Sequence, residues 1–352
     1  MNNNCSDIND FPSSGYLPEC SICVANYNGE DIISACIDSI KNQQFKYPVE
    51  IIVHDDASID NSVRIISEKY PEVILIESPE NVGFCVSNNR MAAKAKGKYI
   101  LLLNNDACLF PDALSKLYNY AETKNKAMIL GLPQYDMETG ELIDRGTLFD
   151  PFMNPVPNFD VKRENVGMVT GACLWLPKSL WEEIEGFPEW FHTLIEDMYL
   201  CCVARVYGYD VRVLPESGFR HYVGRILGGG KVRSGSLSTT FGRRRLSERN
   251  KSFVMVLCWP APYIYFMLPV HILLLVLEGL LLASFKREWR LFRSIYWESV
   301  LALWQYRRIL FCTRRHIQNH SKVSASVFYR AFEWLPFKLR MLIRYGMPEI
   351  KN

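Results

Sequence analysis

The sequence predicts an α/β fold of the nucleotide-binding type, followed by a hydrophobic, membrane-associating helical region. Between residues 21 and 132, short apolar runs alternate with helical stretches, which is the pattern of a parallel sheet with helices on both faces. Residues 253–285 differ in kind, because Glu278 is their only formal charge. These two observations divide the chain into a front part of the α/β type and a helical rear part.

The front part divides into strands and helices in regular order. We expect strands at residues 21–25, 49–53, 73–76, 99–103 and 127–132, and helices at residues 30–42, 60–69, 85–96 and 111–123. Further along, we expect strands at residues 169–176 and 211–214, and helices at residues 178–185 and 196–207. In such a sheet a ligand lies beyond the carboxyl ends of the strands.

Two segments lack this periodicity. Residues 133–168 hold many Pro, Gly, Asn and Asp residues, so we expect loops with short strands that cover an acceptor cleft. Residues 224–250 are rich in Gly, Ser and Arg, which is typical of a flexible loop that orders on ligand binding.

Composition excludes several classes of protein. A chain of 352 residues with 49% hydrophobic and 22% charged residues can bury a sizeable core, and its net charge of +2 gives no support for a nucleic-acid partner. The eleven cysteines are scattered, which indicates reduced thiols. Cys20 and Cys23 form a CxxC motif without the second ligand pair of a zinc site. Residues 1–18 are polar and lack the features of a secretory signal, so we expect none.

The hydrophobic segment favours membrane association. Residues 270–285 are shorter than the roughly 20 apolar residues of a membrane span, whereas the whole segment is longer. We therefore expect a re-entrant or in-plane pair of helices, with a single tilted span as the alternative. Basic and aromatic residues alternate after it, which is typical of interfacial helices on anionic lipid. A buried helical hairpin in a soluble protein is the remaining alternative.

Polar side chains follow three of the expected strands. The segments are residues 24–29 (VANYNG), 54–60 (HDDASID) and 103–106 (LNND). Acids at such positions can hydrogen-bond a base or ribose, or hold a divalent cation on a diphosphate. The glycine fingerprint of dinucleotide enzymes and the P-loop are both missing after the first strand, which argues against NAD enzymes and phosphoryl-transfer NTPases. Asp60 is expected to cap the next helix.

These motifs resemble those of the family 2 glycosyltransferases of the GT-A fold, and within that family the bacterial rhamnosyltransferase-like enzymes. The resemblance runs in family order over about residues 20–252. Its further pieces are Asn81-Val82-Gly83-Phe84 with Asn88-Asn89, Thr170-Gly171-Ala172-Cys173, Gly186-Phe187, Glu196-Asp197 and Arg249-Asn250.

The resemblance implies a donor site for a nucleotide diphosphate sugar. Asp55 would bind the pyrimidine base, and the backbone around Ala25, Asn26 and Tyr27 would form one wall of the site for the base and ribose. The same motifs add Asn81, Asn104, Asn105 and Arg249 to the expected donor-binding residues. Residues 243–245, three arginines, fit either the leaving diphosphate or a membrane-facing patch.

A divalent cation, Mn²⁺ or Mg²⁺, is implied by the same resemblance. Asp106 ends the family's acidic metal motif, which here reads Asn104-Asn105-Asp106 and so retains one carboxylate. One carboxylate can suffice when diphosphate oxygens and water complete the coordination. His221 matches a position that often gives a second ligand, although a lone histidine is often structural.

The acceptor side of the site is expected at the start of the helix over residues 196–207. In inverting transfer a carboxylate removes the proton of the attacking hydroxyl. The resemblance implies that Asp197 is this base, with Glu196 beside it. The alternative is that both acids only complement the helix N-terminus. Tyr199 stands where the family often has a second acid.

We therefore expect an inverting, metal-dependent hexosyltransferase of cell-surface polysaccharide biosynthesis. Its donor would be a dTDP- or UDP-sugar, rhamnose by the overall pattern, and its acceptor a polyprenyl diphosphate-linked glycan. We expect it at the cytoplasmic face of the inner membrane, peripheral or monotopic, bound to an anionic membrane surface. The expected parts are a polar extension (residues 1–18), the catalytic domain (19–252) and the membrane-association region (253–352).

Three alternatives stay open at this point. The first is a non-catalytic membrane scaffold that binds a nucleotide sugar, which would explain why the metal motif retains only one carboxylate. A processive polysaccharide synthase would need several spans and a Gln-x-x-Arg-Trp motif, neither of which the sequence shows. A nucleotidyltransferase would need a glycine-rich loop after the first strand, where this chain has Ala25-Asn26-Tyr27-Asn28.

Overall fold

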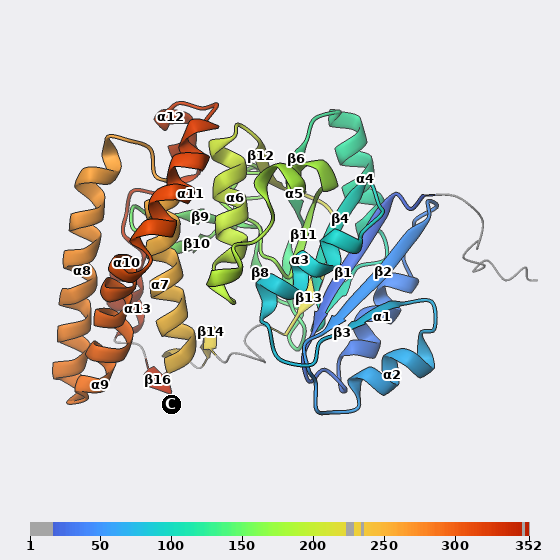
Figure 1. Cartoon of the computed structure of the whole chain (residues 1–352), viewed down its shortest axis with the longest axis horizontal. Coiled ribbons are helices and arrows are strands. Elements are labelled where there is room, and N and C mark those ends of the chain that lie inside the picture. The colour runs from blue at the N-terminus through green and yellow to red at the C-terminus, as the bar shows by residue number, and fades with distance from the viewer. Residues whose placement is uncertain (1–16, 223–228, 234–235, 347–348, 352) are drawn as a thin grey trace, which may run out of the picture.

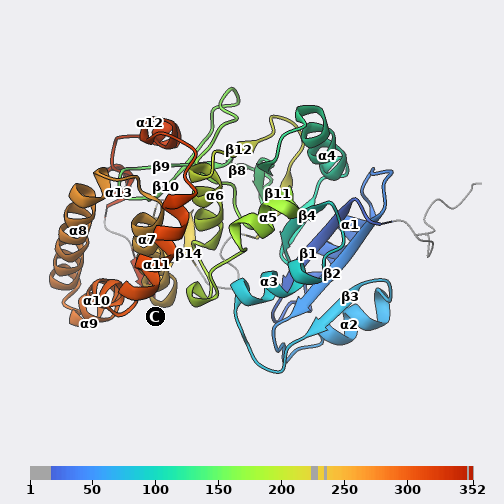
Figure 2. The same ribbon diagram turned by 45° about the horizontal axis from the view of Figure 1, so that its top comes forward.

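A central sheet with helices on both faces forms one side of the molecule, and a layer of helices forms the other (Figure 1). A computed structural model describes residues 17–222, 229–233, 236–346 and 349–351. The polar extension expected at residues 1–18 therefore lies almost wholly outside the described residues. Figure 2 gives the same arrangement from a second direction.

The central sheet has seven strands in the order β12-β6-β11-β4-β1-β2-β3. In chain order they are β1 Cys20–Asn26, β2 Val49–Asp55, β3 Ile74–Glu77, β4 Tyr99–Asn104, β6 Met128–Gly131, β11 Cys173–Pro177 and β12 Asp210–Val213. The expected strands are present, and the sheet strands within residues 21–132 run parallel, as predicted. Strand β11, for which the sequence predicted no direction, runs antiparallel to β4 and β6. The chain leaves β6 at the carboxyl edge of the sheet and enters β11 from that same edge, so β11 must run backwards.

Helices cover both faces of this sheet, as the alternation of the sequence predicts. The helices are α1 Ile33–Lys41, α2 Ser62–Lys69, α3 Phe84–Lys94, α4 Ala113–Lys124, α5 Lys178–Ile184 and α6 Glu196–Val206. Ile22 and Val24 of β1 face one hydrophobic core with α1 and α4, while Cys23 faces the other with α3 and α6. Such burial on both faces explains why the strands read as continuous apolar runs. Cys20 and Cys23 are buried free thiols.

A smaller sheet stands at the carboxyl edge of the large one. Its strands are β5 Ala107–Leu109, β13 Phe219–His221, β7 Gln134–Asp136 and β8 Leu142–Asp144. A hairpin of β9 Thr147–Phe149 and β10 Pro155–Pro157 follows. Pairing of β13 with β5 sets His221 opposite Ala107, one residue after Asp106. The small sheet thus brings together residues that lie far apart in the sequence.

The helical layer begins at residue 241 and lies beside α6. Its elements are α7 Phe241–Cys258, α8 Tyr263–Lys286, α9 Trp289–Leu291, the π-helical turn η2 Phe292–Trp297, α10 Glu298–Gln305, α11 Arg307–Asn319, α12 Ala325–Phe328, the 3-10 turn η3 Tyr329–Ala331 and α13 Phe337–Tyr345. Another 3-10 turn, η1 Glu189–Phe191, precedes α6. Strands β14 Gly229–Arg233, β15 Ser236–Thr240 and β16 Glu349–Lys351 form a third small sheet. The layer is helical, as the sequence predicts.

Helix α7 corrects one expectation and also contains an expected domain boundary. The flexible loop expected over residues 224–250 is wrong for residues 241–250, which form the first half of α7 and begin at a Thr240 cap. The rest of that segment is strand where it is described, and residues 223–228 and 234–235 lie outside the described residues. The expected boundary between residues 252 and 253 falls inside α7, whose residues Phe253 and Leu257 are fully buried in the main core. The rise in hydrophobicity at residue 253 therefore marks burial in protein.

A buried ionic network joins α7 to α8 and α13. The Glu248 carboxylate accepts from Lys251 Nζ at 2.7 Å and from Lys338 Nζ at 2.7 Å, and it lies 3.1 Å from Arg244 Nε. Arg244 and Lys338 also pair with Glu278 of α8. These cations hold the pKa of Glu248 well below its usual range despite burial. The network fixes the helical layer as one unit.

Removing this carboxylate should destabilise the protein strongly. Replacing Glu248 by Ala leaves Lys251, which is 3% exposed, as a buried cation without its carboxylate. Loss of one partner of a buried ion pair costs about 3–5 kcal/mol, so the free energy of unfolding in urea should fall by that amount. The exposed control Glu68→Ala should change it by less than about 0.5 kcal/mol. Equal effects of the two substitutions would contradict a structural role for the network.

Candidate active site

The carboxyl ends of β1, β2 and β4 meet at one edge of the sheet. Their parallel register sets Asn26 beside Asp55 and Ala25 beside Asn104. The polar segments that the sequence places after these strands are therefore neighbours in space. Tyr27 follows β1 and is 38% exposed, so its ring is accessible at this edge.

Asp55 is held rigidly at this edge. Its carboxylate accepts from Asn26 Nδ2 at 2.8 Å, from the Ser58 backbone N–H at 2.9 Å and from Ser58 Oγ at 2.7 Å. Asn105 Nδ2 in turn donates to Asn26 Oδ1 at 2.8 Å. Because a carboxylate has about four acceptor positions, Asp55 keeps capacity for one further donor such as a base N–H. Asn26 and Asn105 thus act on Asp55 through their side chains, which is a positioning role.

Asp56 organises the loop that contains Asn81. Its carboxylate accepts from the backbone N–H groups of Val82 at 2.7 Å and Gly83 at 2.9 Å. Gly83 has φ +88°, and a Cβ there would lie 2.3 Å from His192 Nδ1, so only glycine fits. Asn81 Nδ2 reaches the Asp56 carbonyl at 3.5 Å. No role for Asp56 was predicted from the sequence, although it lies in the strand-end motif at residues 54–60.

Asp106 and His221 lie together, as the expected metal site requires. His221 Nε2 is 3.0 Å from Asp106 Oδ1, and Asn104 Nδ2 is 3.4 Å from the same nitrogen. Asn104 Oδ1 is a buried oxygen without a hydrogen-bond donor, and Asp106 Oδ1, also buried, has His221 Nε2 as its near neighbour. A carboxylate oxygen, an amide oxygen and an imidazole nitrogen are a donor set that suits Mn²⁺ and, less well, Mg²⁺.

The tautomer of His221 bears on that fit. Gln134 Nε2 lies 2.9 Å from His221 Nδ1. The oxygen and nitrogen of an amide are interchangeable by a flip, so Gln134 can instead accept from Nδ1–H and leave the Nε2 lone pair for a cation. The described part of the chain holds no group of three or more His, Cys, Asp or Glu side chains at one point. A cation here would therefore need ligands from a diphosphate.

Glu196 and Asp197 are the first two residues of α6. Asp197 Oδ2 accepts from the Gly171 N–H at 3.1 Å, and Oδ1 accepts from the Met198 N–H at 2.7 Å. Burial raises the pKa of both carboxyls, that of Glu196 from 4.5 to about 8, while the charge of Arg243 opposes the shift. With a pKa of about 8, Glu196 holds a proton at neutral pH. The Glu196 Oε2 atom is buried without a hydrogen-bond partner.

The loop before α6 is strained and clamped. His192, Leu194 and Ile195 have φ values of 67°, 68° and 71°, which residues other than glycine rarely adopt. Asn250 Nδ2 donates to the carbonyls of this loop, including Thr193 at 3.0 Å and Leu194 at 2.8 Å. Asn250 therefore compensates strain in the segment that sets the direction of Asp197.

Arg249 also holds the loop before α6, together with Asn250. Its Nε donates to Asn250 Oδ1 at 2.9 Å, and its Nη2 donates to the Phe191 carbonyl at 3.1 Å. The motif at residues 249–250 is thus placed where it can order the acceptor loop, and a donor contact of Arg249 stays a prediction. Apart from the motif Arg249-Asn250, nothing in the sequence predicts that these two residues hold the loop before α6.

The three neighbouring arginines have different surroundings. Arg244 belongs to the buried network, and Arg245 Nη1 pairs with Glu298 at 3.2 Å. Arg243 lies close enough to Glu196 and Asp197 for their charges to act on its pKa, which burial lowers. Only for Arg243, among these three, does the structure show an electrostatic link to the candidate site.

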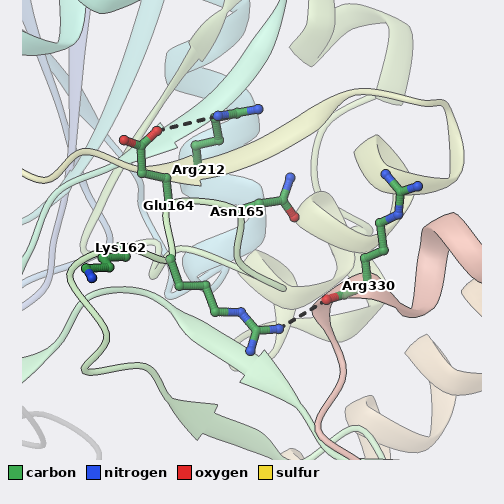
Figure 3. A pocket seen from close by; sticks show the side chains of 6 residues that line it. Lys162, Glu164, Asn165, Arg212 and Arg330 are labelled. Carbon is green, nitrogen blue, oxygen red and sulfur yellow. Dashed lines mark hydrogen bonds and ion pairs between the residues drawn. The ribbon is translucent and has the colours of Figure 1, made fainter.

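A basic hollow elsewhere on the molecule is separate from this site. It has a volume of about 430 Å³ and is lined by Lys162, Arg163, Glu164, Asn165, Arg212 and Arg330. Figure 3 shows the ion pair between Glu164 and Arg212 and the hydrogen bond from Arg163 to the Arg330 carbonyl. This lining contains none of the predicted site residues.

The raised pKa of Glu196 gives a pH test of the site. The folded protein keeps the Glu196 proton up to about pH 8, whereas the unfolded chain loses it near pH 4.5. This carboxyl therefore makes the free energy of unfolding fall as pH rises through that window, because the folded state binds the extra proton. The neutral variant Glu196→Gln should show a flatter profile in urea unfolding between pH 5 and pH 8. A profile as steep as that of the exposed control Glu182→Gln would contradict the buried, protonated state.

Solved structures share the fold. TarS 1-349 from S. aureus superposes with a TM-score of 0.51 at 13% identity over 86% of this chain and 90% of that one. A structure described as GalNAc-T7 with UDP, GalNAc and Mn²⁺ gives a TM-score of 0.55 at 16% identity over 70% of this chain and 49% of that one. At such identities the likeness shows the mixed α/β, GT-A-like fold alone.

Sequence comparisons carry the assignment further. The family model Glycosyl transferase family 2 matches residues 21–184. An uncharacterized glycosyltransferase of Methanocaldococcus jannaschii is 33% identical over 201 residues, which are 55% of this chain and 68% of the relative.

Larger relatives match over shorter shares of their length. The poly(ribitol-phosphate) beta-glucosyltransferase of Bacillus spizizenii is 39% identical over 116 residues, which are 32% of this chain and 18% of that protein. A chondroitin synthase of Pasteurella multocida is 28% identical over 189 residues, which are 52% of this chain and 19% of that protein. The aligned part thus spans about a fifth of the length of these curated relatives. Together with the order of its motifs and its fold, these matches show that the chain belongs to the family 2 glycosyltransferases.

Proposed function

We propose that this glycosyltransferase moves a sugar, with inversion, from a dTDP- or UDP-sugar to a polyprenyl diphosphate-linked glycan in cell-surface polysaccharide biosynthesis. The observation that carries the proposal is the convergence of three groups at the carboxyl edge of one sheet. These are the braced Asp55, the pair of Asp106 and His221, and the buried acids at the start of α6. They correspond to base recognition, diphosphate binding and deprotonation of an acceptor.

The donor side rests on Asp55 and its neighbours. The remaining acceptor position of Asp55 suits the N–H of a pyrimidine base, and the exposed Tyr27 ring beside it offers an apolar wall. The structural neighbours described with UDP support a uridine or thymidine nucleotide. Rhamnose as the sugar is proposed from the motif pattern of the sequence, and a panel of donors tests it.

The proposed cation site rests on Asp106 Oδ1, Asn104 Oδ1 and His221 Nε2. Asp106, His221 and Asn104 would hold Mn²⁺ or Mg²⁺. When bound, the cation would supply positive charge against the negative charge that develops on the departing nucleoside diphosphate.

The acceptor side rests on Asp197. The two backbone N–H groups that Asp197 accepts from fix the direction of its carboxylate, and Arg243 favours the ionised form. Glu196 holds its proton up to about pH 8, so Asp197 is the acid of the pair suited to take a proton from a hydroxyl. The strained loop held by Asn250 keeps this carboxylate in place.

The acceptor and location are proposed from the helical layer and the relatives. Relatives named for poly(ribitol-phosphate) and chondroitin chains support polysaccharide assembly. The described helices include one, Tyr263–Lys286, that is long and apolar enough to cross a membrane by length and composition. We place the enzyme at the cytoplasmic face of the inner membrane, peripheral or monotopic, where lipid-linked acceptors are held.

Removing the proposed base should separate binding from chemistry. Asp197→Asn keeps the shape of the side chain but cannot accept the proton, so transfer should fall by about a hundredfold or more while donor binding is nearly unchanged. Nucleotide release and donor calorimetry measure the two quantities. The exposed control Glu182→Gln should match the wild type in both. Full transfer by Asp197→Asn would remove this residue from the role.

The cation site has its own test, which does not depend on turnover. Asp106→Ala should weaken Mn²⁺-dependent donor binding by about tenfold or more, because the one carboxylate ligand is lost. Calorimetry with Mn²⁺ and with a chelator gives the comparison, and Asp112→Ala serves as a control aspartate outside the site. If the wild type binds donor equally with and without cation, the metal assignment is wrong.

A further inference from the structure

Helix α8 has two apolar faces, only one of which packs on the protein. Ile264, Leu275 and Leu282 are buried against the helical layer. The opposite face presents Phe266, Leu273, Leu277, Leu281 and Phe285, which are 44–72% exposed. We call these five residues the outer stripe. A surface helix of a protein surrounded by water carries polar residues on that face, so the outer stripe indicates a non-aqueous neighbour.

The inner face of α8 is fixed, so the helix cannot turn its outer stripe inwards. Glu278 pairs with Lys338 at 2.7 Å and with Arg244. His271 Nε2 lies 2.8 Å from Ser252 Oγ of α7. Gly279 packs so closely on Tyr296 that a Cβ would meet its Cγ at 2.6 Å. In Figures 1 and 2, α8 is the outermost helix on the side away from the central sheet.

These contacts favour an in-plane orientation over a span. With 24 residues, α8 is about 36 Å long and could cross a bilayer by length alone. Its inner face, however, is bound along its length to α7 and η2, and Glu248, Lys251 and Lys338 lie behind it. A span would carry these charges to the middle of the hydrocarbon, at a cost of several kcal/mol each. When α8 lies along the membrane surface, only its outer stripe contacts lipid.

A groove lies beyond the carboxyl end of α8. Its volume is about 540 Å³, and its lining combines apolar and cationic side chains, which are Trp289, Trp297, Leu301, Arg290, Arg293, Ser294 and Glu298. Glu298 is paired with Arg245 at 3.2 Å, so it does not neutralise the groove arginines. Arg290 lies over the Phe241 ring at 5.0 Å, and Arg293 has no ion-pair partner in the part of the chain that the structure describes.

We propose that this groove binds the phosphate of an anionic bilayer lipid while the outer stripe lies at the headgroup and acyl boundary. Two guanidinium groups and Ser294 match phosphate oxygens, and the flanking Trp289 and Trp297 match the interface where indole rings concentrate. The proposal deepens the proposed function, because it names the surface that would bring the enzyme to a membrane-held acceptor.

A second copy of the chain is a poorer occupant of the same face. A second copy placed with its groove against the groove of the first would bring Arg290 and Arg293 of each copy towards the same arginines of the other. Like charges facing one another oppose association, whereas an anionic lipid surface attracts them. Charge therefore favours the bilayer.

Vesicle binding of the full chain tests the proposal without any sugar transfer. The probes are vesicles of phosphatidylcholine alone and with a third of phosphatidylglycerol. Arg290→Gln with Arg293→Gln should weaken binding to the anionic vesicles roughly thirtyfold, since each basic side chain near such a surface contributes about fivefold. Leu273→Asn with Leu281→Asn should weaken binding to the anionic vesicles by at least about tenfold.

The control Arg64→Gln with Lys96→Gln removes the same charge from the exposed surface of the catalytic part. It should bind like the wild type, and circular dichroism with UDP binding confirms that every variant is folded. Equal binding by the groove variant and this control would overturn the headgroup site. A wild-type chain that binds no vesicle, or a dimer in ultracentrifugation that the leucine variant splits, would overturn the lipid assignment. Loss of transfer with intact vesicle binding would count against the proposed function alone.

Discussion

Parallel pairing of β1 with β2 on one side and β4 on the other delivers three strand ends to one edge of the sheet. That register places Asn26 next to Asp55 and Ala25 next to Asn104. Every later feature of the site builds on this edge. Asn105 braces Asn26, Asp106 begins the turn into β5, and β13 pairs with β5 to bring back His221. If the register slipped by one residue, each of these side chains would face the opposite side of the sheet.

Helix α7 is the second element on which the molecule depends. Its first turns place Arg243 near the acids of α6, and Asn250 holds the strained loop that precedes them. Between these positions, Arg244 and Glu248 tie the helix to α8 and α13. The same helix thus lies near Glu196 and Asp197 on one side and is paired with the outermost apolar helix on the other. We infer that docking of the helical layer and orientation of the acceptor loop are physically connected.

Much of the catalytic fold could be predicted from the sequence, because its strands are short apolar runs between clear turn residues. The polar ends of β1, β2 and β4 could be found for the same reason. The antiparallel direction of β11 could not, since an apolar run carries no sign of its direction. Residues 241–250 were misjudged because their arginines and Glu248 look solvated in sequence, whereas their partners Lys338 and Glu278 lie far along the chain.

The side-chain roles were harder to predict than the elements. Asp55 and Asp56 are adjacent acids, and only the structure shows that Asp55 is held by Asn26 and Ser58 while Asp56 orders the turn before α3. The contrast between Glu196 and Asp197 likewise depends on burial and on Arg243, which lies 46 residues further along the chain. Exposure of one face of α8 also needed the packed structure, because both of its faces are apolar in sequence.

Release of free nucleotide from a panel of dTDP-, UDP- and GDP-sugars tests whether this chain transfers a sugar. The measurement combines the purified full chain, Mn²⁺ and a lipid-linked acceptor extract. We expect release from a dTDP- or UDP-sugar that requires both the cation and the extract. Tight binding of one nucleotide without release from any donor would contradict it and favour a non-catalytic nucleotide-sugar binder.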